Sequence, residues 1–197
     1  MKSLTEIFAE IGNNTGVDIG CNDKGGIHTY LETYERLFKP FRNGCTIMEI
    51  GLAMGDSLKL WREYFTNSKI VGVDISIVFE HSHLVGKDNN GNLNTFWEVD
   101  ATKDLILDFI STFEQVKKFN LTGFDIIIDD GSHMEADQFK TFKLLKDKMK
   151  PGGVYIIEDI LALDQNRHKF EALHTNCEII DMRHTGRFDN VLIIYRF

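Results

Sequence analysis

The feature of the sequence that most constrains the fold is a regular alternation between short apolar runs and longer stretches whose apolar residues recur at helical spacing. The first run, 46–50, ends in glycines that lead into the helical pattern of Leu58, Trp61 and Phe65. This order predicts a strand, a turn and a helix. Short, continuously apolar strands are typical of a parallel sheet that is covered on both faces. The same alternation predicts further strands at 70–73, 96–99, 124–128 and 154–157.

Two capping boxes mark the start of helices near the N-terminus. Ser3 and Glu6 have the spacing at which each side chain can bond the backbone N–H of the other, and their helix is predicted to end at Gly12. Thr29 and Glu32 repeat this spacing and predict a second helix, which the following proline stops. Apolar residues at helical intervals predict later helices at 105–119 and 135–149.

The C-terminal part of the sequence predicts an antiparallel hairpin of two strands, 178–182 and 190–195, because a polar loop without a helical pattern separates them. Alternating strands and helices followed by a hairpin are typical of a doubly wound α/β sheet. The polar stretch 86–94 is predicted to be a mobile surface loop. We find no repeat and no linker, so we expect one domain, 1–197, whose N-terminal part, 1–44, is a helical segment that can act as a lid.

The charge and the cysteine content exclude several classes of protein. The sequence has 30 acidic and 22 basic residues, a net charge of -8 and no basic stripe, so we expect no nucleic-acid partner. Its apolar runs are far shorter than the roughly twenty residues that span a bilayer. Glu6 and Glu10 interrupt any apolar run near the start, so we expect a cytoplasmic protein without a membrane partner. Cys21, Cys45 and Cys177 are odd in number and widely spaced, which favours reduced thiols over disulfides or a zinc site.

Glycines and acids at the ends of the first two strands predict a nucleoside ligand. Gly51 and Gly55 follow the first strand, where glycine lets the backbone approach a ligand closely. The third glycine of the dinucleotide fingerprint is absent, and Glu49 would repel a pyrophosphate. Glu49 suits a cationic ligand instead, and Asp74 is placed to accept hydrogen bonds from ribose hydroxyls. A nucleoside with a positive charge indicates S-adenosylmethionine, although a tight turn and a helix cap would explain either feature alone.

A second group of acids predicts a metal site. Asp129 and Asp130 follow the fourth strand, and Glu158 and Asp159 follow the fifth. The carboxyl ends of parallel strands meet at one edge of the sheet, so these four carboxylates should converge. Their mutual repulsion would be costly without a counter-charge. Mg²⁺ or a similar divalent cation would relieve it, because such a cation binds carboxylate oxygens and keeps positions open for the hydroxyls of a sugar diol.

His133, in the same DDGSH segment, is the candidate general base. An imidazole titrates near neutral pH and can take a proton from a hydroxyl. The alternative is that Asp129, Asp130 and Ser132 cap the following helix while His133 lies on its surface. We assign no role to the histidines at positions 81, 83, 168, 174 and 184.

Five ordered segments resemble class I S-adenosylmethionine-dependent methyltransferases, and more narrowly the metal-dependent sugar O-methyltransferases that modify macrolide sugars and related glycans. These segments are NDKGGIHTYLETYERLF, EIGLAMGDSLKLW, DIIIDDGSHMEADQ, PGGVYIIEDI and GRFDNVLIIYRF. The likeness covers nearly the whole chain. It implies a Rossmann-like, three-layer α/β/α fold with a seven-stranded sheet, strand order 3-2-1-4-5-7-6 and an antiparallel last strand.

The resemblance also implies roles for individual residues. Asp130, Glu158 and Asp159 would be the Mg²⁺ ligands, and His133 would be the base. The cofactor would be held by Glu49, Gly51, Ser57, Asp74, Ile75, Asp100, Ala101 and Asp129. In this set Asp100 would face the amino group of the adenine. The substrate side and the lid would be formed by Lys24, His28, Tyr30 and Tyr34.

We therefore expect an O-methyltransferase that moves a methyl group from S-adenosylmethionine to a sugar hydroxyl, with Mg²⁺ and a histidine base. The acceptor would be a sugar nucleotide, a glycan or a glycosylated natural product. Two alternatives stay open: an enzyme that methylates a catechol or another vicinal diol, and a nucleoside-binding domain without catalysis. Whether the chain forms a homo-oligomer is left open as well.

Overall fold

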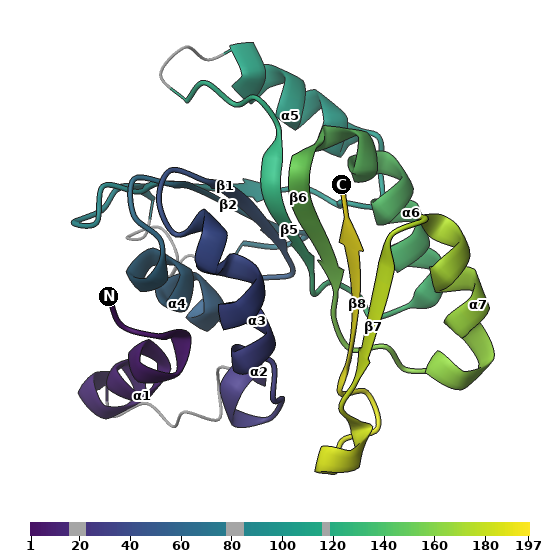
Figure 1. The fold of residues 1–197 in the computed structure, drawn as a ribbon. Helices are drawn as coiled ribbons and strands as arrows, with labels where there is room; N and C mark the ends of the chain where they lie inside the picture. The colour runs from purple at the N-terminus through teal and green to yellow at the C-terminus, as the bar shows by residue number, and fades with distance from the viewer. Residues whose placement is uncertain (16–22, 78–84, 116–118) are drawn as a thin grey trace.

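Eight strands form one mixed sheet with helices on both faces (Figure 1). The computed structural model describes residues 1–15, 23–77, 85–115 and 119–197. The strands are β1 (Thr46–Ile50), β2 (Lys69–Asp74), β3 (Gly86–Lys87), β4 (Leu93–Glu98), β5 (Phe124–Asp129), β6 (Met149–Ile157), β7 (Cys177–Asp181) and β8 (Val191–Arg196). Their order across the sheet is β3-β4-β2-β1-β5-β6-β8-β7.

Strand direction agrees with the doubly wound prediction. The neighbours β4, β2, β1, β5 and β6 run parallel. β8 runs antiparallel to both β6 and β7. The predicted order and the antiparallel last strand are therefore confirmed for the seven predicted strands. The short β3, antiparallel to β4, adds an eighth strand at one edge.

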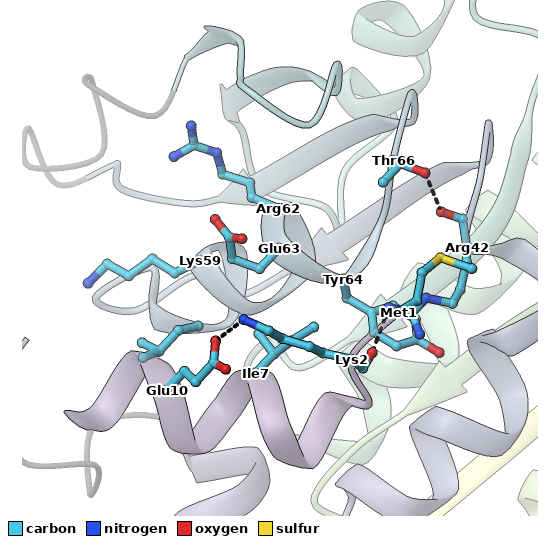
Figure 2. A pocket seen from close by; sticks show the side chains of 11 residues that line it. Met1, Lys2, Ile7, Glu10, Arg42, Lys59, Arg62, Glu63, Tyr64 and Thr66 are labelled. Atoms are coloured by element: carbon cyan, nitrogen blue, oxygen red, sulfur yellow. Dashed lines mark hydrogen bonds and ion pairs between the residues drawn. The ribbon is translucent and has the colours of Figure 1, made fainter. Parts of the chain in front are cut away.

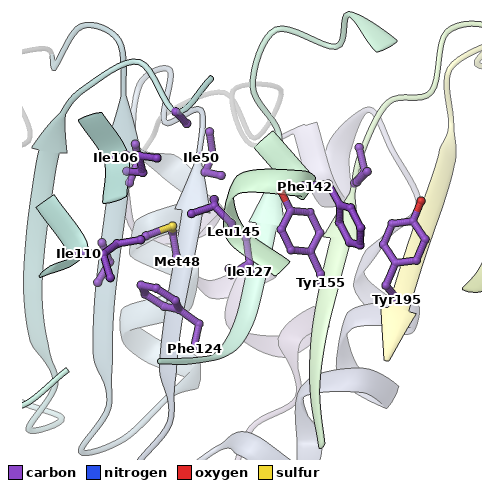
Figure 3. Close-up of a cluster of buried hydrophobic side chains, with 14 of the residues drawn as sticks. Met48, Ile50, Ile106, Ile110, Phe124, Ile127, Phe142, Leu145, Tyr155 and Tyr195 are labelled. Carbon is purple, nitrogen blue, oxygen red and sulfur yellow. The ribbon is translucent and has the colours of Figure 1, made fainter. Parts of the chain in front are cut away.

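The helices are divided between the two faces of the sheet. The first face carries α1 (Leu4–Thr15), α3 (Leu31–Phe38) and α4 (Asp56–Tyr64), and the second carries α5 (Leu105–Gln115), α6 (Glu135–Leu145) and α7 (Leu163–Leu173). Figure 3 shows the second face, where Met48 and Ile127 lie near Leu145 of α6, and Phe142 of the same helix lies between Tyr155 and Tyr195. The short α2 (Asp23–Gly26) lies near the turn between β7 and β8 (Figure 1). No helix of the described residues is both long and apolar enough to cross a bilayer.

The pleat of the strands decides which face each acidic side chain reaches, because successive side chains point to opposite faces. Ile47 packs in the cluster under α1, α3 and α4, whereas Met48 packs in the cluster under α5 to α7. Glu49 therefore shares the face of Ile47 and points toward α4. Ile156 in β6 lies on that same face. Glu158, two residues further on, consequently points toward the N-terminal helices.

The prediction of a surface loop at 86–94 is wrong. β3 and the start of β4 pair there, and Asn92 is completely buried. The Asn92 side chain accepts a hydrogen bond from the backbone N–H of Ser68 at 3.0 Å and donates to the carbonyl oxygen of Phe65 at 2.9 Å. Asn92 and Asn94 are thus buried in this stretch, whereas Lys87 and Asn89 are exposed.

The first capping box is confirmed and the second is wrong. The backbone N–H of Ser3 donates to Glu6 Oε2 at 2.7 Å, although α1 continues past the predicted end to Thr15. α3 starts without a side-chain cap. Thr29 Oγ1 instead accepts a hydrogen bond from Asn190 Nδ2 at 3.1 Å. A contact with the turn between β7 and β8 therefore replaces the local one.

Several other boundaries differ from the predictions. α2 and α7 were not predicted, and the helix predicted at 135–149 ends at Leu145, where a short 3-10 helix (Lys146–Lys148) follows. β6 begins at Met149, five residues before the predicted start. The predicted helix 105–119 is observed as α5, and positions 116–118 lie outside the described residues, as do Cys21, His81 and His83.

The ends of β1 and β5 approach each other at Gly51. Its φ is +86°, a left-handed conformation that favours glycine. Its N–H donates to the carbonyl oxygen of Val73 at 2.8 Å, and the N–H of Asp130 donates to the carbonyl oxygen of Ile50 at 2.9 Å. A Cβ atom at Gly51 would lie 2.0 Å from the carbonyl oxygen of Asp130. Only glycine fits this junction.

Gly51→Ala should therefore destabilise the protein through both strain and overlap. Gly44→Ala is the matched control, because Gly44 has a φ of +80° but a Cβ atom there would meet nothing within 4 Å. We expect Gly51→Ala to lower the free energy of unfolding by about 2 to 3 kcal/mol more than Gly44→Ala does. Urea denaturation measures both. Equal losses in the two variants would contradict the close approach.

Candidate functional site

Two neighbouring cavities lie at the carboxyl ends of the parallel strands, where ligands of doubly wound sheets bind. One has a volume of about 420 Å³ and the other of about 290 Å³. Both are lined by Gly51, Asp74 and Gly131. The two cavities therefore meet at the ends of β1, β2 and β5.

The larger cavity brings together most of the predicted cofactor residues. Its lining includes Gly51, Asp74, Ile75, Asp100, Ala101 and Asp129. Asp74 accepts hydrogen bonds from the N–H groups of Leu52, at 2.7 Å, and Ser76, at 3.0 Å, which fix its carboxylate at the cavity wall. Hydrogen bonds from the hydroxyl and N–H of Thr102 lower the pKa of Asp100.

Several lining residues of this cavity escaped prediction, among them Thr102, Gln138 and Thr141. Gln138 and Thr141 are both buried on α6 and stand three residues apart. Helix positions with this spacing lie on one face. Two polar residues on the buried face of an otherwise apolar helix pattern are the signal that could have identified them.

Asp129 lies on the second face of the sheet, at the end of β5. Burial raises its pKa to about 7, although the N–H of Gly131 and the hydroxyl of Tyr155 both stabilise its charged form. The Tyr155 hydroxyl is 3.3 Å from Asp129 Oδ2. Asp129 thus belongs to the larger cavity, away from the other acids of its segment.

Glu49, which was predicted to hold the cofactor, lines neither cavity, and its side chain is only 1% exposed. Ser57 Oγ donates to Glu49 Oε2 at 2.7 Å, and Trp61 Nε1 donates to the same oxygen at 2.9 Å. Glu49 Oε1 lies 3.3 Å from the ammonium nitrogen of Lys24 and makes no hydrogen bond within the described residues. The contact is therefore an ion pair without hydrogen-bond geometry. Ser57, also predicted, lines the smaller cavity.

Lys24 is the cation of the acidic cluster. Its ammonium nitrogen lies 2.7 Å from Asp130 Oδ2 and 2.9 Å from Glu158 Oε1, besides the contact with Glu49. The hydroxyl of Tyr34 donates to the same oxygen of Glu158. Burial raises the pKa of Glu158 to about 7 even though Lys24 favours its charged form. Only one ammonium thus balances several buried carboxylates in this part of the described chain.

Asp159 is held by the other predicted lid residues. The Tyr30 hydroxyl donates to Asp159 Oδ1 at 2.6 Å, and His28 Nε2 lies 3.5 Å from Oδ2. Asp159 adopts a φ of +55°, a strained conformation that side chains rarely take and that often marks functional sites. The segment after α2 therefore contacts the acids that follow β6.

His133 lies at the same carboxyl edge of the sheet. It lines the smaller cavity with Lys24 and Asp130, and it too has a positive φ, +57°. His133 Nδ1 is buried and makes no hydrogen bond within the described residues. One potential ligand atom each from Asp130, His133 and Asp159 lie within 4.8 Å of one another. The sequence motifs are thus brought together as predicted, whereas their roles stay predictions.

The capping alternative for this segment finds no support. α6 follows Met134 and has no side-chain cap. Ser132 Oγ donates to Asp137 Oδ2 at 2.7 Å and accepts from the N–H of Met134 at 3.3 Å. Asp129 instead lines the larger of the two cavities, and Asp130 lines the smaller one.

A third cavity, of about 580 Å³, lies between α1 and α4 and is lined by none of the predicted site residues (Figure 2). Lys2 pairs there with Glu10, and Arg42 donates to the carbonyl oxygen of Lys2 at 2.7 Å, although Arg42 Nε makes no hydrogen bond within the described residues. The Arg42 guanidinium also stacks on Tyr64, 4.0 Å from the ring centre. We therefore assign the functional site to the two smaller cavities.

A second group of possible metal ligands lies beside the first and comprises His28, Asp159 and Asp189. Both oxygens of Asp189 already accept hydrogen bonds from Arg187, at 2.9 and 2.7 Å. This pairing makes Asp189 a poor ligand, so the group that contains Asp130 is the better candidate.

Comparison with known proteins supports the resemblance seen in the sequence. No protein-family model matches the chain. It is 35% identical over 151 residues to the 8-demethyl-8-alpha-L-rhamnosyl tetracenomycin-C 2'-O-methyltransferase of Streptomyces olivaceus, covering 71% of this chain and 35% of that protein. The mycinamicin VI 2''-O-methyltransferase of Micromonospora griseorubida is 31% identical over 144 residues, which cover 69% of this chain and 32% of that protein.

A solved structure shares the fold. It is the MycE methyltransferase of the mycinamycin biosynthetic pathway in complex with Mg, S-adenosylhomocysteine and mycinamycin VI. The match covers 96% of this chain and 53% of the MycE chain, with a TM-score of 0.69 and 21% sequence identity. The chain spans about a third of the length of the curated relatives it matches. It is thus a homologue of sugar O-methyltransferases that act on glycosylated natural products, and it has the Rossmann-like fold of S-adenosylmethionine-dependent methyltransferases.

Proposed function

We propose that the chain transfers a methyl group from S-adenosylmethionine to a sugar hydroxyl. The observation that carries the proposal is the junction of two cavities at Gly51, Asp74 and Gly131. One cavity has the lining that a nucleoside needs, and the other has an imidazole nitrogen without a hydrogen bond in the described part of the chain, beside buried carboxylates. The named activities of the homologues favour the same reaction.

The larger cavity would hold the methyl donor. Asp74 presents its carboxylate where ribose hydroxyls can donate to it, and Ile75, which is 73% exposed, offers an apolar surface beside it. Asp100, Ala101 and Thr102 line the same cavity and would meet the adenine. The cavity of about 420 Å³ lies within the range of small-molecule sites.

The smaller cavity would hold the acceptor hydroxyl. His133 Nδ1 is buried and forms no hydrogen bond with any described residue. A neutral imidazole nitrogen in this state can accept the proton of the acceptor hydroxyl. Its place beside the junction of the cavities would keep the proton transfer close to the transferred methyl group, and direct transfer depends on such positioning.

The residues present fit a divalent cation such as Mg²⁺. Glu158 and Asp159 are 1% and 6% exposed, and the Lys24 ammonium already occupies a position among the carboxylates. Asp130, Glu158 and Asp159 would hold the metal with the oxygen ligands that Mg²⁺ prefers. When bound, the cation would acidify and orient acceptor hydroxyls.

Three further expectations stay predictions: a cytoplasmic location, no nucleic-acid partner and no membrane partner.

His133→Ala should lower turnover by about 10²- to 10⁴-fold, because it removes the proton acceptor, while the affinity for S-adenosylhomocysteine should stay nearly unchanged. The assay follows labelled methyl transfer with Mg²⁺ to a panel of glycosides, sugar nucleotides and catechols, with His168→Ala, an exposed histidine, as control. Full activity in the His133 variant would refute its role as the base. Wild-type activity on catechols alone would favour the vicinal-diol alternative, and donor binding without any transfer would favour the nucleoside-binding alternative.

Asp74→Asn should weaken the binding of S-adenosylhomocysteine by about 10- to 100-fold, because an amide replaces the charged acceptor for the ribose hydroxyls. Calorimetry measures the dissociation constant, and a thermal scan checks that the variant is folded. Asp104→Asn is the control, because Asp104 is exposed and lines neither cavity. Unchanged affinity in a folded Asp74 variant would contradict the donor site.

A further inference from the structure

The position of Lys24 conflicts with a metal in the same cluster. Its ammonium nitrogen contacts Asp130 Oδ2 at 2.7 Å and Glu158 Oε1 at 2.9 Å. Both residues belong to the set that would hold the cation. A divalent cation on these oxygens and an ammonium at the same position would repel each other strongly, since both charges are shielded from water. One of the two has to leave.

Lys24 is also well suited to leave. It comes from α2, a helix of only four residues, whereas its partners follow strands of the central sheet. The hydrogen bond that the carbonyl oxygen of Lys24 accepts from the N–H of Tyr30, at 3.0 Å, does not depend on the position of the ammonium. The Lys24 side chain is nevertheless only 1% exposed, because the buried carboxylates need a counter-charge.

We propose that Lys24 is the counter-ion of the metal-free site, and that a divalent cation binds by displacing the Lys24 ammonium from Asp130 and Glu158. This inference rests on the proposed function, since it takes the acidic cluster as the metal site. Lys24 keeps the cluster neutral enough to stay folded without metal. The cation then takes over that task with two positive charges in place of one.

The displacement also affects Glu49. Glu49 Oε1 has the Lys24 ammonium as its ion-pair partner at 3.3 Å and makes no hydrogen bond within the described residues. When Lys24 leaves, the buried negative charge of Glu49 is no longer balanced by it. The second positive charge of the cation would then offset Glu49.

Chemical labelling of amines in the wild-type protein tests the displacement directly. The protein is treated with an acetylating reagent with and without saturating Mg²⁺, and mass spectrometry measures modification of each lysine. We expect Mg²⁺ to raise the labelling rate of Lys24 at least tenfold, while Lys103, whose side chain is 60% exposed, keeps its rate. Continued protection of Lys24 with Mg²⁺ bound would overturn the inference and leave the proposed function intact.

Calorimetry of Mg²⁺ binding supplies the second measurement, on the wild type, Lys24→Met and the control Lys39→Met, which changes an exposed lysine outside the three cavities. Competition predicts that Lys24→Met binds Mg²⁺ at least tenfold more tightly than the other two proteins. Equal or weaker binding by a folded Lys24 variant would overturn the inference. Failure of every protein to bind Mg²⁺ would overturn the inference together with the metal part of the proposed function. The labelling arm uses the wild type, so the test stands even if Lys24→Met does not fold.

Discussion

One ammonium group, that of Lys24, holds together carboxylates that come from three separate strand ends. Glu49 lies in β1, Asp130 follows β5 and Glu158 follows β6. Burying these acids side by side is unfavourable unless a cation offsets their charge. The close approach of these acids at the carboxyl edge of the sheet depends on this arrangement.

The pleat of the sheet sends the acids at the strand ends to different faces. Glu49 and Glu158 share the face that α3 and α4 cover, whereas Asp129 turns to the face of α5 to α7 and meets Tyr155. Adjacent acids in one short motif, Asp129 and Asp130, therefore line different cavities. The two cavities meet at Gly51, where the lack of a side chain lets β1 and β5 close together.

Much of the central sheet could be predicted from the sequence, because short apolar runs that end in glycine or acid leave few alternatives. α7 was missed because only Leu163 and Phe170 of its residues are buried, which gives a weak helical period. The capping box at Thr29 failed because its hydroxyl bonds across the fold to Asn190. Local spacing cannot reveal a tertiary partner of this kind.

The candidate site shows the same limit. The acids and His133 could be proposed from the strand ends on which they lie, but the structure was needed to find the central role of Lys24. Its contacts reach 106 and 134 residues along the chain, to Asp130 and Glu158. No periodic pattern surrounds it in the sequence, and a lysine among glycines is ordinarily a surface residue.

A crystal structure with Mn²⁺ and S-adenosylhomocysteine, recorded at the manganese absorption edge, tests the central claim most directly. The account predicts an anomalous peak between the carboxylates of Asp130, Glu158 and Asp159, with the ribose of the ligand on Asp74. A ligand that binds elsewhere, or a peak confined to His28 and Asp189, would contradict it.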